Sequence, residues 1–207
     1  MQIVGLDIGG ANLKAASADG QAASRPLEIW RQPDRLGEQL DRLLADLPAA
    51  DALAVTMTAE LADCFPTKAE GVRRILDSVL QTAAGRPVVV WQTGGEFVSI
   101  ADAKDLSQLV AAANWHALAT FSGRLAQKGD AILIDIGSTT TDLIPIHDGM
   151  PVPWGLTDLA RLASHELVYT GVERTPVCSL ASQVTLENRP VGLAAELFAT
   201  TRDIYLL

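Results

Sequence analysis

A segment that occurs twice constrains this chain more than any other feature of its sequence. Residues 3–20 read IVGLDIGGANLKAASADG, and residues 131–149 read AILIDIGSTTTDLIPIHDG. Aligned without a gap, both copies share the tripeptide DIG, which begins at Asp7 and at Asp135. Each copy is an apolar run, an acidic residue, a tight polar turn and a second apolar run, a pattern typical of a β-hairpin. The duplication predicts a fold with two similar lobes.

Strand-like and helix-like segments alternate between the two copies and after them. Apolar spacing predicts helices over residues 34–47, 67–84, 105–127 and 156–170, and strands over 52–57 and 87–91. This alternation predicts an α/β fold built on a mixed sheet. We expect a first lobe in residues 1–128 and the start of a second lobe in residues 129–207. The second lobe is expected to be incomplete, because the sequence ends on the apolar residues IYLL.

Composition and charge exclude several classes of partner. The chain has 207 residues, with 16 basic against 25 acidic side chains and a formal net charge of −9. An acidic surface disfavours nucleic acid or an anionic membrane as the main partner. No apolar stretch is long enough to span a bilayer, and the first residues lack the basic region of a signal peptide. Two cysteines without metal-ligand spacing fit a cytoplasmic protein. The oligomeric state stays open, with a homodimer among the expectations.

The first hairpin, DIGGANLK, has the composition of a phosphate-binding turn. Gly9 and Gly10 let backbone N–H groups approach a ligand without a Cβ in the way, and successive N–H groups form a concavity for anions. Asn12 and Lys14 add a donor and a positive charge. Asp7 repels a phosphate, so its expected role is to hold Mg²⁺ through water.

The second hairpin, DIGSTTTD, repeats this composition with more hydroxyl groups. Asp135 takes the place of Asp7 as a catalytic and Mg²⁺-holding candidate. The remaining phosphate-binding candidates are Gly137, Ser138, Thr139, Thr140 and Thr141. Either hairpin alone has a plain structural explanation, because glycine turns are common and aspartate often forms turns. Two matched copies favour a function.

Hairpins of the DxGGxxxK and DxGSTTTD kind resemble the two phosphate-binding segments of the actin-like ATPase superfamily. A closer resemblance is to its hydantoinase/oxoprolinase A-like branch, and within it to proteins of tetrahydromethanopterin- and methanofuran-linked one-carbon metabolism. Residues 55–72, 112–119, 166–181 and 196–207 carry that resemblance. It implies an actin-like ATPase fold of two ribonuclease H-like lobes, each of βββαβα type, whose hairpins clamp a phosphate-bearing ligand and Mg²⁺.

The resemblance also implies an activity. Members of this branch are taken to join an aminomethylfuran-methyl diphosphate to the phenol of γ-glutamyl-tyramine, releasing pyrophosphate. The expected partner is therefore a small-molecule diphosphate. A second hypothesis is an ATP-dependent small-molecule kinase or an oxoprolinase-like ATPase, although the superfamily's adenosine-binding Gly-Gly segment is not found in this sequence. A third is a non-catalytic regulator, which the matched acidic residues of the two hairpins argue against.

Further candidates follow the predicted strand at 52–57. Glu60 is expected to act as a base or as a second Mg²⁺ anchor, with Thr58 and Lys68 as substrate-binding residues. The alternative is that this segment only caps the next helix, through Asp63 or Thr67.

Asn114 and His116 lie in a helical, otherwise apolar segment. A single histidine in such a place is more often structural than catalytic, but the family resemblance favours His116 as a catalytic residue and Asn114 as a substrate-binding one. Arg174 has two open interpretations, a phosphate contact and an ordinary surface residue.

Overall fold

The computed structural model describes all residues from Met1 to Leu207. The chain divides into two compact units, Met1–Arg124 and Leu125–Leu207, and each is described by itself. The division falls between Arg124 and Leu125, where the sequence suggested a boundary after Lys128.

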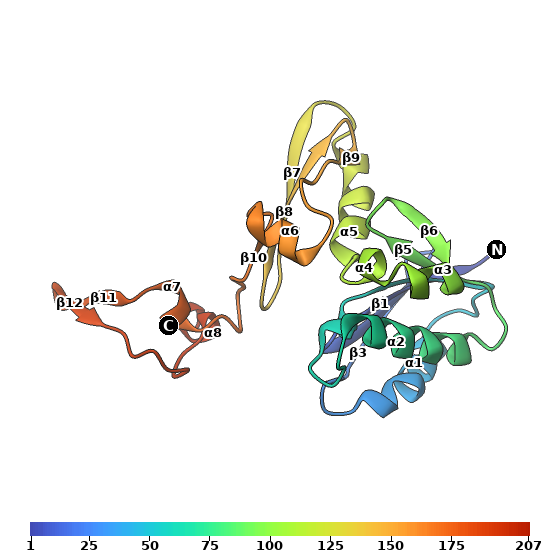
Figure 1. Cartoon of the computed structure of the whole chain (residues 1–207), viewed down its shortest axis with the longest axis horizontal. Coiled ribbons are helices and arrows are strands. Elements are labelled where there is room, and N and C mark those ends of the chain that lie inside the picture. The colour runs from blue at the N-terminus through green and yellow to red at the C-terminus, as the bar shows by residue number, and fades with distance from the viewer. The chain divides into compact units, whose positions relative to one another are not determined.

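The first unit is built on one mixed six-stranded sheet (Figure 1). Its strands are β1 (Ile3–Ile8), β2 (Asn12–Ser17), β3 (Ala22–Pro26), β4 (Ala52–Met57), β5 (Val88–Gln92) and β6 (Glu96–Ser99), in the order β3-β2-β1-β4-β5-β6. β1, β2 and β3 pair antiparallel, whereas β4 runs parallel to β1 and β5 runs parallel to β4. The mixed α/β architecture predicted from the sequence is confirmed, and β4 has the predicted bounds.

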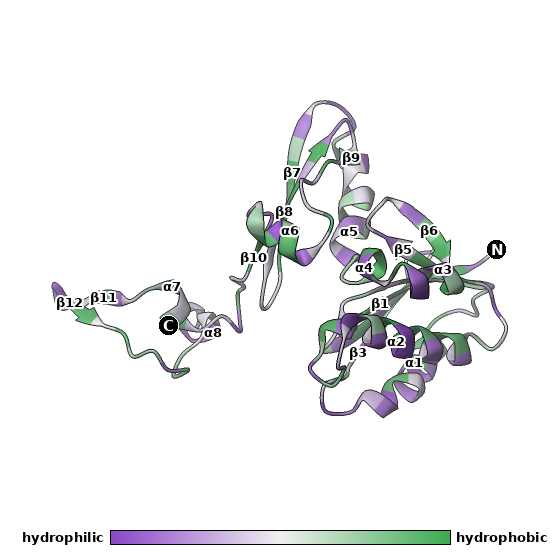
Figure 2. Ribbon diagram, in the orientation of Figure 1, coloured by the Kyte–Doolittle hydropathy of each residue, from purple (hydrophilic) through white to green (hydrophobic).

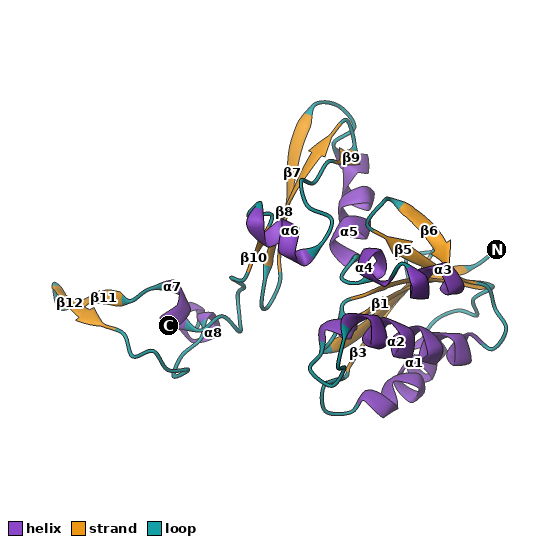
Figure 3. Ribbon diagram, in the orientation of Figure 1, coloured by secondary structure: helices purple, strands orange, loops and turns teal.

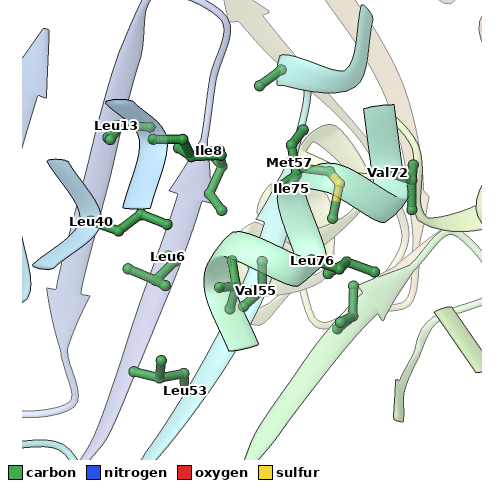
Figure 4. Packing of buried hydrophobic residues seen from close by; sticks show 14 of the residues in the cluster. Leu6, Ile8, Leu13, Leu40, Leu53, Val55, Met57, Val72, Ile75 and Leu76 are labelled. Carbon is green, nitrogen blue, oxygen red and sulfur yellow. The ribbon is translucent and has the colours of Figure 1, made fainter. Parts of the chain in front are cut away.

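Two helices close one face of this sheet. They are α1 (Leu36–Ala45), preceded by the 3₁₀ turn η1 (Pro33–Arg35), and α2 (Lys68–Ala83). Both mix hydrophobic and hydrophilic residues, as Figure 2 shows, and their leucine, isoleucine and valine side chains are buried at helical spacing. Figure 4 shows these side chains meeting alternate residues of β1 and β4, such as Leu6, Ile8 and Val55. Each such side chain contributes about 1.5–3 kcal/mol on burial.

The order of elements from β1 to α2 is βββαβα, the order expected of the first lobe. The 3₁₀ turn η2 (Ala59–Leu61) also belongs to this unit, and the 3₁₀ turn η3 (Gly123–Leu125) spans the division between the units.

The single long helix expected over residues 105–127 is wrong. This range instead contains two short helices, α4 (Ser107–Val110) and α5 (Asn114–Ser122), and follows a third, α3 (Ile100–Asp105). The helix breaks at Ala112, whose φ is +49°. The Ala112 N–H donates to Glu60 Oε1 at 2.8 Å instead of to a helical carbonyl. A residue in this left-handed conformation cannot continue a right-handed helix.

The second unit begins with the other hairpin (Figure 3). Its elements are β7 (Asp130–Ile136), β8 (Thr141–His147), β9 (Met150–Pro151), α6 (Asp158–Ala163), β10 (Leu167–Val168), α7 (Val177–Leu180), β11 (Gln183–Leu186), β12 (Arg189–Gly192) and α8 (Thr201–Tyr205). β10, β8 and β7 are neighbours in that order, and β9 pairs with β8. The predicted helix over 156–170 is too long, because the chain turns at His165, with φ +60°, and enters β10.

The two faces of the β7–β8 hairpin differ in exposure. Ile144 and Ile146 of β8 are buried on one face. On the other face Ile132, Ile134 and Ile136 are 57–68% exposed. The packing within this unit therefore covers one side of the hairpin. No helix in the structure is both long enough and apolar enough to cross a membrane.

Candidate functional site

The turn between β1 and β2 presents backbone donors. Its Gly9 N–H donates to the Asn12 carbonyl at 3.0 Å, which closes the turn. The carbonyls of Gly10 and Ala11 accept hydrogen bonds at 3.0 and 2.9 Å from amides of the segment that follows β3. The N–H groups of Gly10 and Ala11 have no acceptor within the chain. A turn with its carbonyls occupied and its N–H groups available is suited to bind an anion.

The turn between β7 and β8 is built in the same way. Gly137 N–H donates to the Thr140 carbonyl at 2.8 Å. The carbonyls of Gly137 and Ser138 accept hydrogen bonds of 2.8–3.1 Å from the amides of residues 172–174. The N–H groups of Ser138 and Thr139 have no acceptor within the chain. The closing bond and the two N–H groups without an acceptor fall at aligned positions in the two copies, whereas the occupied carbonyls of the second turn lie one position earlier.

Close packing explains the glycines at both turns. A Cβ at Gly9 would lie 2.8 Å from the Asn12 carbonyl oxygen. A Cβ at Gly171 would lie 2.5 Å from backbone atoms of Ser138 and Thr139. Gly171 thus supports the second turn from behind. Sequence reasoning missed this role, and the only available signal was the position of Gly171 within the family-like segment 166–181.

Arg174 also reaches the second turn. Its guanidinium donates to Ser138 Oγ at 3.2 Å, and the arginine side chain is exposed. Of its two open interpretations, this placement favours a contact with a phosphate bound at the turn. Thr141 is placed differently, because its hydroxyl donates to the Thr170 carbonyl at 2.6 Å, a bond within the fold.

The charged residue opposite each aspartate differs between the hairpins. Asp7 pairs across the strands with Lys14, and Lys14 Nζ lies 3.2 Å from Asp7 Oδ2. Asp7 Oδ1 is buried and has no hydrogen-bond partner. Asp135 instead faces another carboxylate, Asp142. Two like charges directly opposite each other destabilise a strand pair.

A buried arginine compensates for this second pair. Arg161 of α6 is 1% exposed, and its guanidinium lies 2.8 Å from Asp142 Oδ1. Burial raises the pKa of Asp142, the hydrogen bond and charge of Arg161 oppose that rise, and the charges of Asp135 and Asp158 add to it. In the first hairpin the cation beside the aspartate is Lys14, on the neighbouring strand. In the second hairpin it is Arg161, which reaches Asp142 from α6.

The same arginine connects to a second buried acid. Arg161 donates to the Glu166 carbonyl at 3.0 Å. The Glu166 carboxylate accepts from the amides of Trp154 and Gly155 at 2.7 and 3.0 Å. Sequence reasoning missed Arg161 and Glu166 as supports of the hairpin, because nothing in a sequence marks a charge that long-range packing will bury.

Glu60 is buried and makes contacts within the first unit. It is 2% exposed, and Oε1 accepts the Ala112 N–H. Its backbone packs against α2, where a Cβ at Gly71 would lie 2.8 Å from the Glu60 carbonyl oxygen. These contacts hold α2 and the α4–α5 break together, so the geometry supports a structural role. The predicted catalytic role stays a prediction.

Thr58, by contrast, is beside the first turn. Its N–H donates to the Ile8 carbonyl at 2.9 Å, and its Oγ1 lies 3.8 Å from the position of a Cβ on Gly9. Lys68 is the first residue of α2 and is partly buried. Thr67 caps that helix by accepting the Glu70 N–H at 3.2 Å.

His116 and Asn114 belong to α5. His116 is 6% exposed, and its Nδ1 accepts a hydrogen bond from Trp91 Nε1 at 3.3 Å. Its ring also lies 5.3 Å, centroid to centroid, from the ring of Trp115. Asn114 begins the helix and is partly exposed. The contacts of His116 are with aromatic and helical neighbours, and the predicted roles of His116 and Asn114 stay predictions.

The acidic residues of the hairpins suit a hydrated ion better than a directly coordinated one. No group of three or more histidine, cysteine, aspartate or glutamate side chains in the chain is arranged to hold a metal. The unpartnered Asp7 Oδ1 is an oxygen of the kind that Mg²⁺ or its water ligands prefer. Asp7 therefore fits a water-mediated contact with Mg²⁺, and the predicted Mg²⁺ role of Asp135 stays a prediction.

Comparisons with a family model and with curated proteins place the chain in a known family. A family model described as hydantoinase/oxoprolinase matches residues 51–207. A curated protein of Methanocaldococcus jannaschii, named (4-{4-[2-(gamma-L-glutamylamino)ethyl]phenoxymethyl}furan-2-yl)methanamine synthase, is 40% identical over 210 residues, covering 100% of this chain and 62% of its own length. A protein of the same name from Methanococcus vannielii is 44% identical over 78 residues, or 38% of this chain and 35% of that protein.

Solved structures resemble the chain more weakly. A Ppx/GppA family member of Aquifex aeolicus has a TM-score of 0.41 and 12% identity, covering 74% of this chain and 49% of that one. Ta0583, an archaeal actin homolog in complex with ADP, has a TM-score of 0.39 and 17% identity, covering 93% and 74%. At these scores the likeness adds nothing to the α/β architecture described above.

Proposed function

Because the chain belongs to the hydantoinase/oxoprolinase family, we propose that it acts as a synthase that condenses an aminomethylfuran-methyl diphosphate with γ-glutamyl-tyramine and releases pyrophosphate. The observation that carries this proposal is the 40% identity to a relative, named for the ether product, along the whole of this chain. The chain spans 62% of that relative's length. The activity of the whole protein is therefore part of the proposal.

The reaction is balanced without a redox partner. The phenol oxygen forms a bond to the methylene carbon on the furan, and the bond from that carbon to the diphosphate oxygen breaks. The phenol proton passes to a base, and pyrophosphate leaves with the electron pair. The furan ring delocalises positive charge on the methylene group, so the protein has to position the phenol and stabilise the leaving diphosphate.

Each hairpin turn contributes backbone donors to this task. The N–H groups of Gly10 and Ala11 in the first turn, and of Ser138 and Thr139 in the second, are available for phosphate oxygens. Arg174 adds a positive charge beside Ser138. Such preorganised donors stabilise charge that develops on a leaving oxygen.

Mg²⁺ belongs to the proposal. Asp7 would contact the water ligands of such an ion at the first turn, and Asp135 would do so at the second turn. An ion bound at either turn would offset negative charge on a diphosphate. Lys14 keeps the Asp7 carboxylate oriented through its 3.2 Å ion pair.

Thermal unfolding with two ligands tests the proposal. A ligand at about 100 times its Kd stabilises the folded state by about 2.7 kcal/mol. That corresponds to a rise in Tm of about 5–10 °C for a chain of this size. We expect this rise with Mg²⁺-pyrophosphate and not with Mg²⁺-ADP. A rise with ADP alone would favour the kinase or ATPase hypothesis, and no rise with either would contradict phosphate binding.

A matched pair of glycine variants tests whether the rise in Tm with pyrophosphate comes from binding at the first turn. Gly9→Ala places a Cβ 2.8 Å from the Asn12 carbonyl oxygen and should distort the first turn, reducing the rise with pyrophosphate. Gly37→Ala, in α1, meets nothing within 4 Å and should leave that rise unchanged. Equal responses of the two variants would show that the first turn does not bind the ligand.

A further inference from the structure

The face of the first unit's sheet that α1 and α2 leave open forms the floor of a cavity. The cavity has a volume of about 800 Å³ and lies wholly within residues 5–124. That volume falls in the range of sites that hold drug-sized molecules, about 300–1,000 Å³.

Strand register divides the floor into two rows. One row is polar and runs across four strands as Ser24, Lys14, Asp7 and Thr56. The next row is formed by Ala22, Ala16, Gly5 and Ala54, none of which carries more than a methyl group. All eight residues line the cavity. A sheet surface without large side chains is flat, so a planar ring can lie against it.

The polar row contains groups that the fold leaves unpaired. Asp7 Oδ1 and Thr56 Oγ1 are buried and have no hydrogen-bond partner. Buried polar atoms without partners cost free energy, and a ligand that supplies a donor or acceptor recovers it.

Aromatic and cationic side chains form the walls. Phe97 and Phe121 line the cavity with 53% and 62% of their surface exposed. Phe97 packs edge-on against Trp91, with ring centroids 4.8 Å apart. Arg124 lines the same cavity and takes part in none of the ion pairs of the chain. Its guanidinium lies 5.2 Å from the Phe121 ring and is available to a carboxylate.

We propose that this cavity is the subsite for the phenolic substrate, γ-glutamyl-tyramine. This inference rests on the proposed function and adds the place where one of its two substrates binds. The phenol ring lies on the alanine and glycine row, its hydroxyl faces Asp7 and Thr56, and the γ-glutamyl carboxylate pairs with Arg124. Lys14, beside Asp7, stabilises negative charge on the phenol oxygen.

The other substrate fits this cavity less well. A furan diphosphate carries its charge on phosphate oxygens, and the backbone donors suited to them are at Gly10 and Ala11. Neither residue lines the cavity. Asp7 and Lys14 are the cavity-lining residues nearest to the first turn along the hairpin, so the phenol oxygen would meet the methylene carbon beside this pair.

Isothermal titration of the full chain with γ-glutamyl-tyramine tests the inference. Ala16 is exposed, so Ala16→Leu fills the floor of the cavity without disturbing the core. We expect this variant to bind γ-glutamyl-tyramine at least about tenfold more weakly. Ala101→Leu, on the exposed side of α3 and outside the cavity, is the matched control and should bind as the unmodified chain does. The analogue that lacks the phenol hydroxyl should also bind more weakly.

A parallel titration with Mg²⁺-pyrophosphate separates the two proposals, and Ala16→Leu should leave that binding unchanged. If the chain binds pyrophosphate but not γ-glutamyl-tyramine, the subsite is overturned and the proposed function is not. If it binds neither, both fail. Equal binding of γ-glutamyl-tyramine to the chain and to Ala16→Leu would overturn the location. Tighter binding of furfurylamine than of γ-glutamyl-tyramine would overturn the choice of substrate.

Discussion

Gly171 is a residue at which the second hairpin turn tolerates no side chain. A Cβ there would lie 2.5–2.6 Å from three backbone atoms of residues 137–139. Gly171→Ala must push the turn away, and we expect it to cost about 1–3 kcal/mol of stability, as overpacking does. Pyrophosphate binding should weaken as well. Chemical denaturation measures the first effect and titration the second.

Gly192→Ala is the control, because a Cβ at that position, in the same unit, meets nothing within 4 Å. If Gly171→Ala and Gly192→Ala behaved alike, the support that Gly171 gives to the turn would be disproved.

The raised pKa of Asp142 predicts a pH dependence. A carboxyl whose pKa is higher folded than unfolded favours the folded state when protonated, and that contribution is lost as pH rises through the raised pKa. Asp142→Asn has no such group. As pH rises from below 3.8, the ordinary pKa, through the raised pKa, the unmodified chain should lose this contribution and the variant should not. The free energy of unfolding of the variant minus that of the unmodified chain should therefore increase. Urea unfolding at several pH values measures this difference, and a difference that stayed constant with pH would contradict the prediction.

At the residue scale, the sequence is a good guide to which chemical groups lie near one another along the chain. It is a poor guide to which side chains become buried. The glycines and the acidic residue of each hairpin lie within a few positions of one another, so their pattern is visible in the chain. Arg161 and Gly171 act on the second hairpin from 19 or more positions further along. Their roles follow from packing that no local pattern records.

The break between α4 and α5 depends on a contact with one distant side chain. Glu60 Oε1 accepts the N–H of Ala112, which is 52 positions away. Glu60→Ala should leave this buried N–H without a partner and cost about 1–3 kcal/mol. Glu60→Gln keeps an acceptor oxygen and should lose much less stability, as measured by the shift in Tm.

Turnover in the proposed reaction separates the structural role of Glu60 from the predicted catalytic one. A glutamine cannot accept the phenol proton, so a stable but inactive Glu60→Gln would reinstate Glu60 as the base.

Among the elements, the segments with the clearest local pattern are the best predicted. The strand at 52–57 is bounded as expected, because apolar residues at alternate positions need only their own strand neighbours. The segment 105–127 is apolar enough for one helix, yet it is divided by the Glu60–Ala112 hydrogen bond. Its helical propensity is overridden by a tertiary contact, which propensity alone cannot show.

At the scale of the whole molecule, the chain divides into two compact units, and each of them contains one copy of the repeated hairpin. The four residues after Leu125 belong to no helix or strand, and Leu125 is 89% exposed. Limited trypsin digestion should therefore cut first after Lys128, and Lys128→Gln should slow that cut. An early cut after Arg73 or Arg74 in α2 would instead show that the first unit opens before the connecting segment is cleaved. Mass spectrometry of the fragments decides between them.

The repeat predicts less of the structure of the second unit, residues 125–207, than the position of its hairpin alone suggests. The repeat showed where the second hairpin lies, and the structure confirms a hairpin there. It did not show that α6 would be short, or that an isoleucine face of β7 would stay exposed. Those features depend on what packs against the hairpin, and the repeat carries no information about that.

The backbone hydrogen bonds of the two turns have a consequence for how such a site is inherited. Of the four aligned turn positions, only the first, Gly9 and Gly137, is the same in both copies, yet the bond that closes each turn measures 3.0 Å in one and 2.8 Å in the other. The donors are peptide groups, which every residue except proline possesses. Substitutions can therefore accumulate in the side chains of such a turn while its backbone donors stay in place. An alanine scan across the turn would pass over these donors, whereas replacing single amides by esters would reveal them.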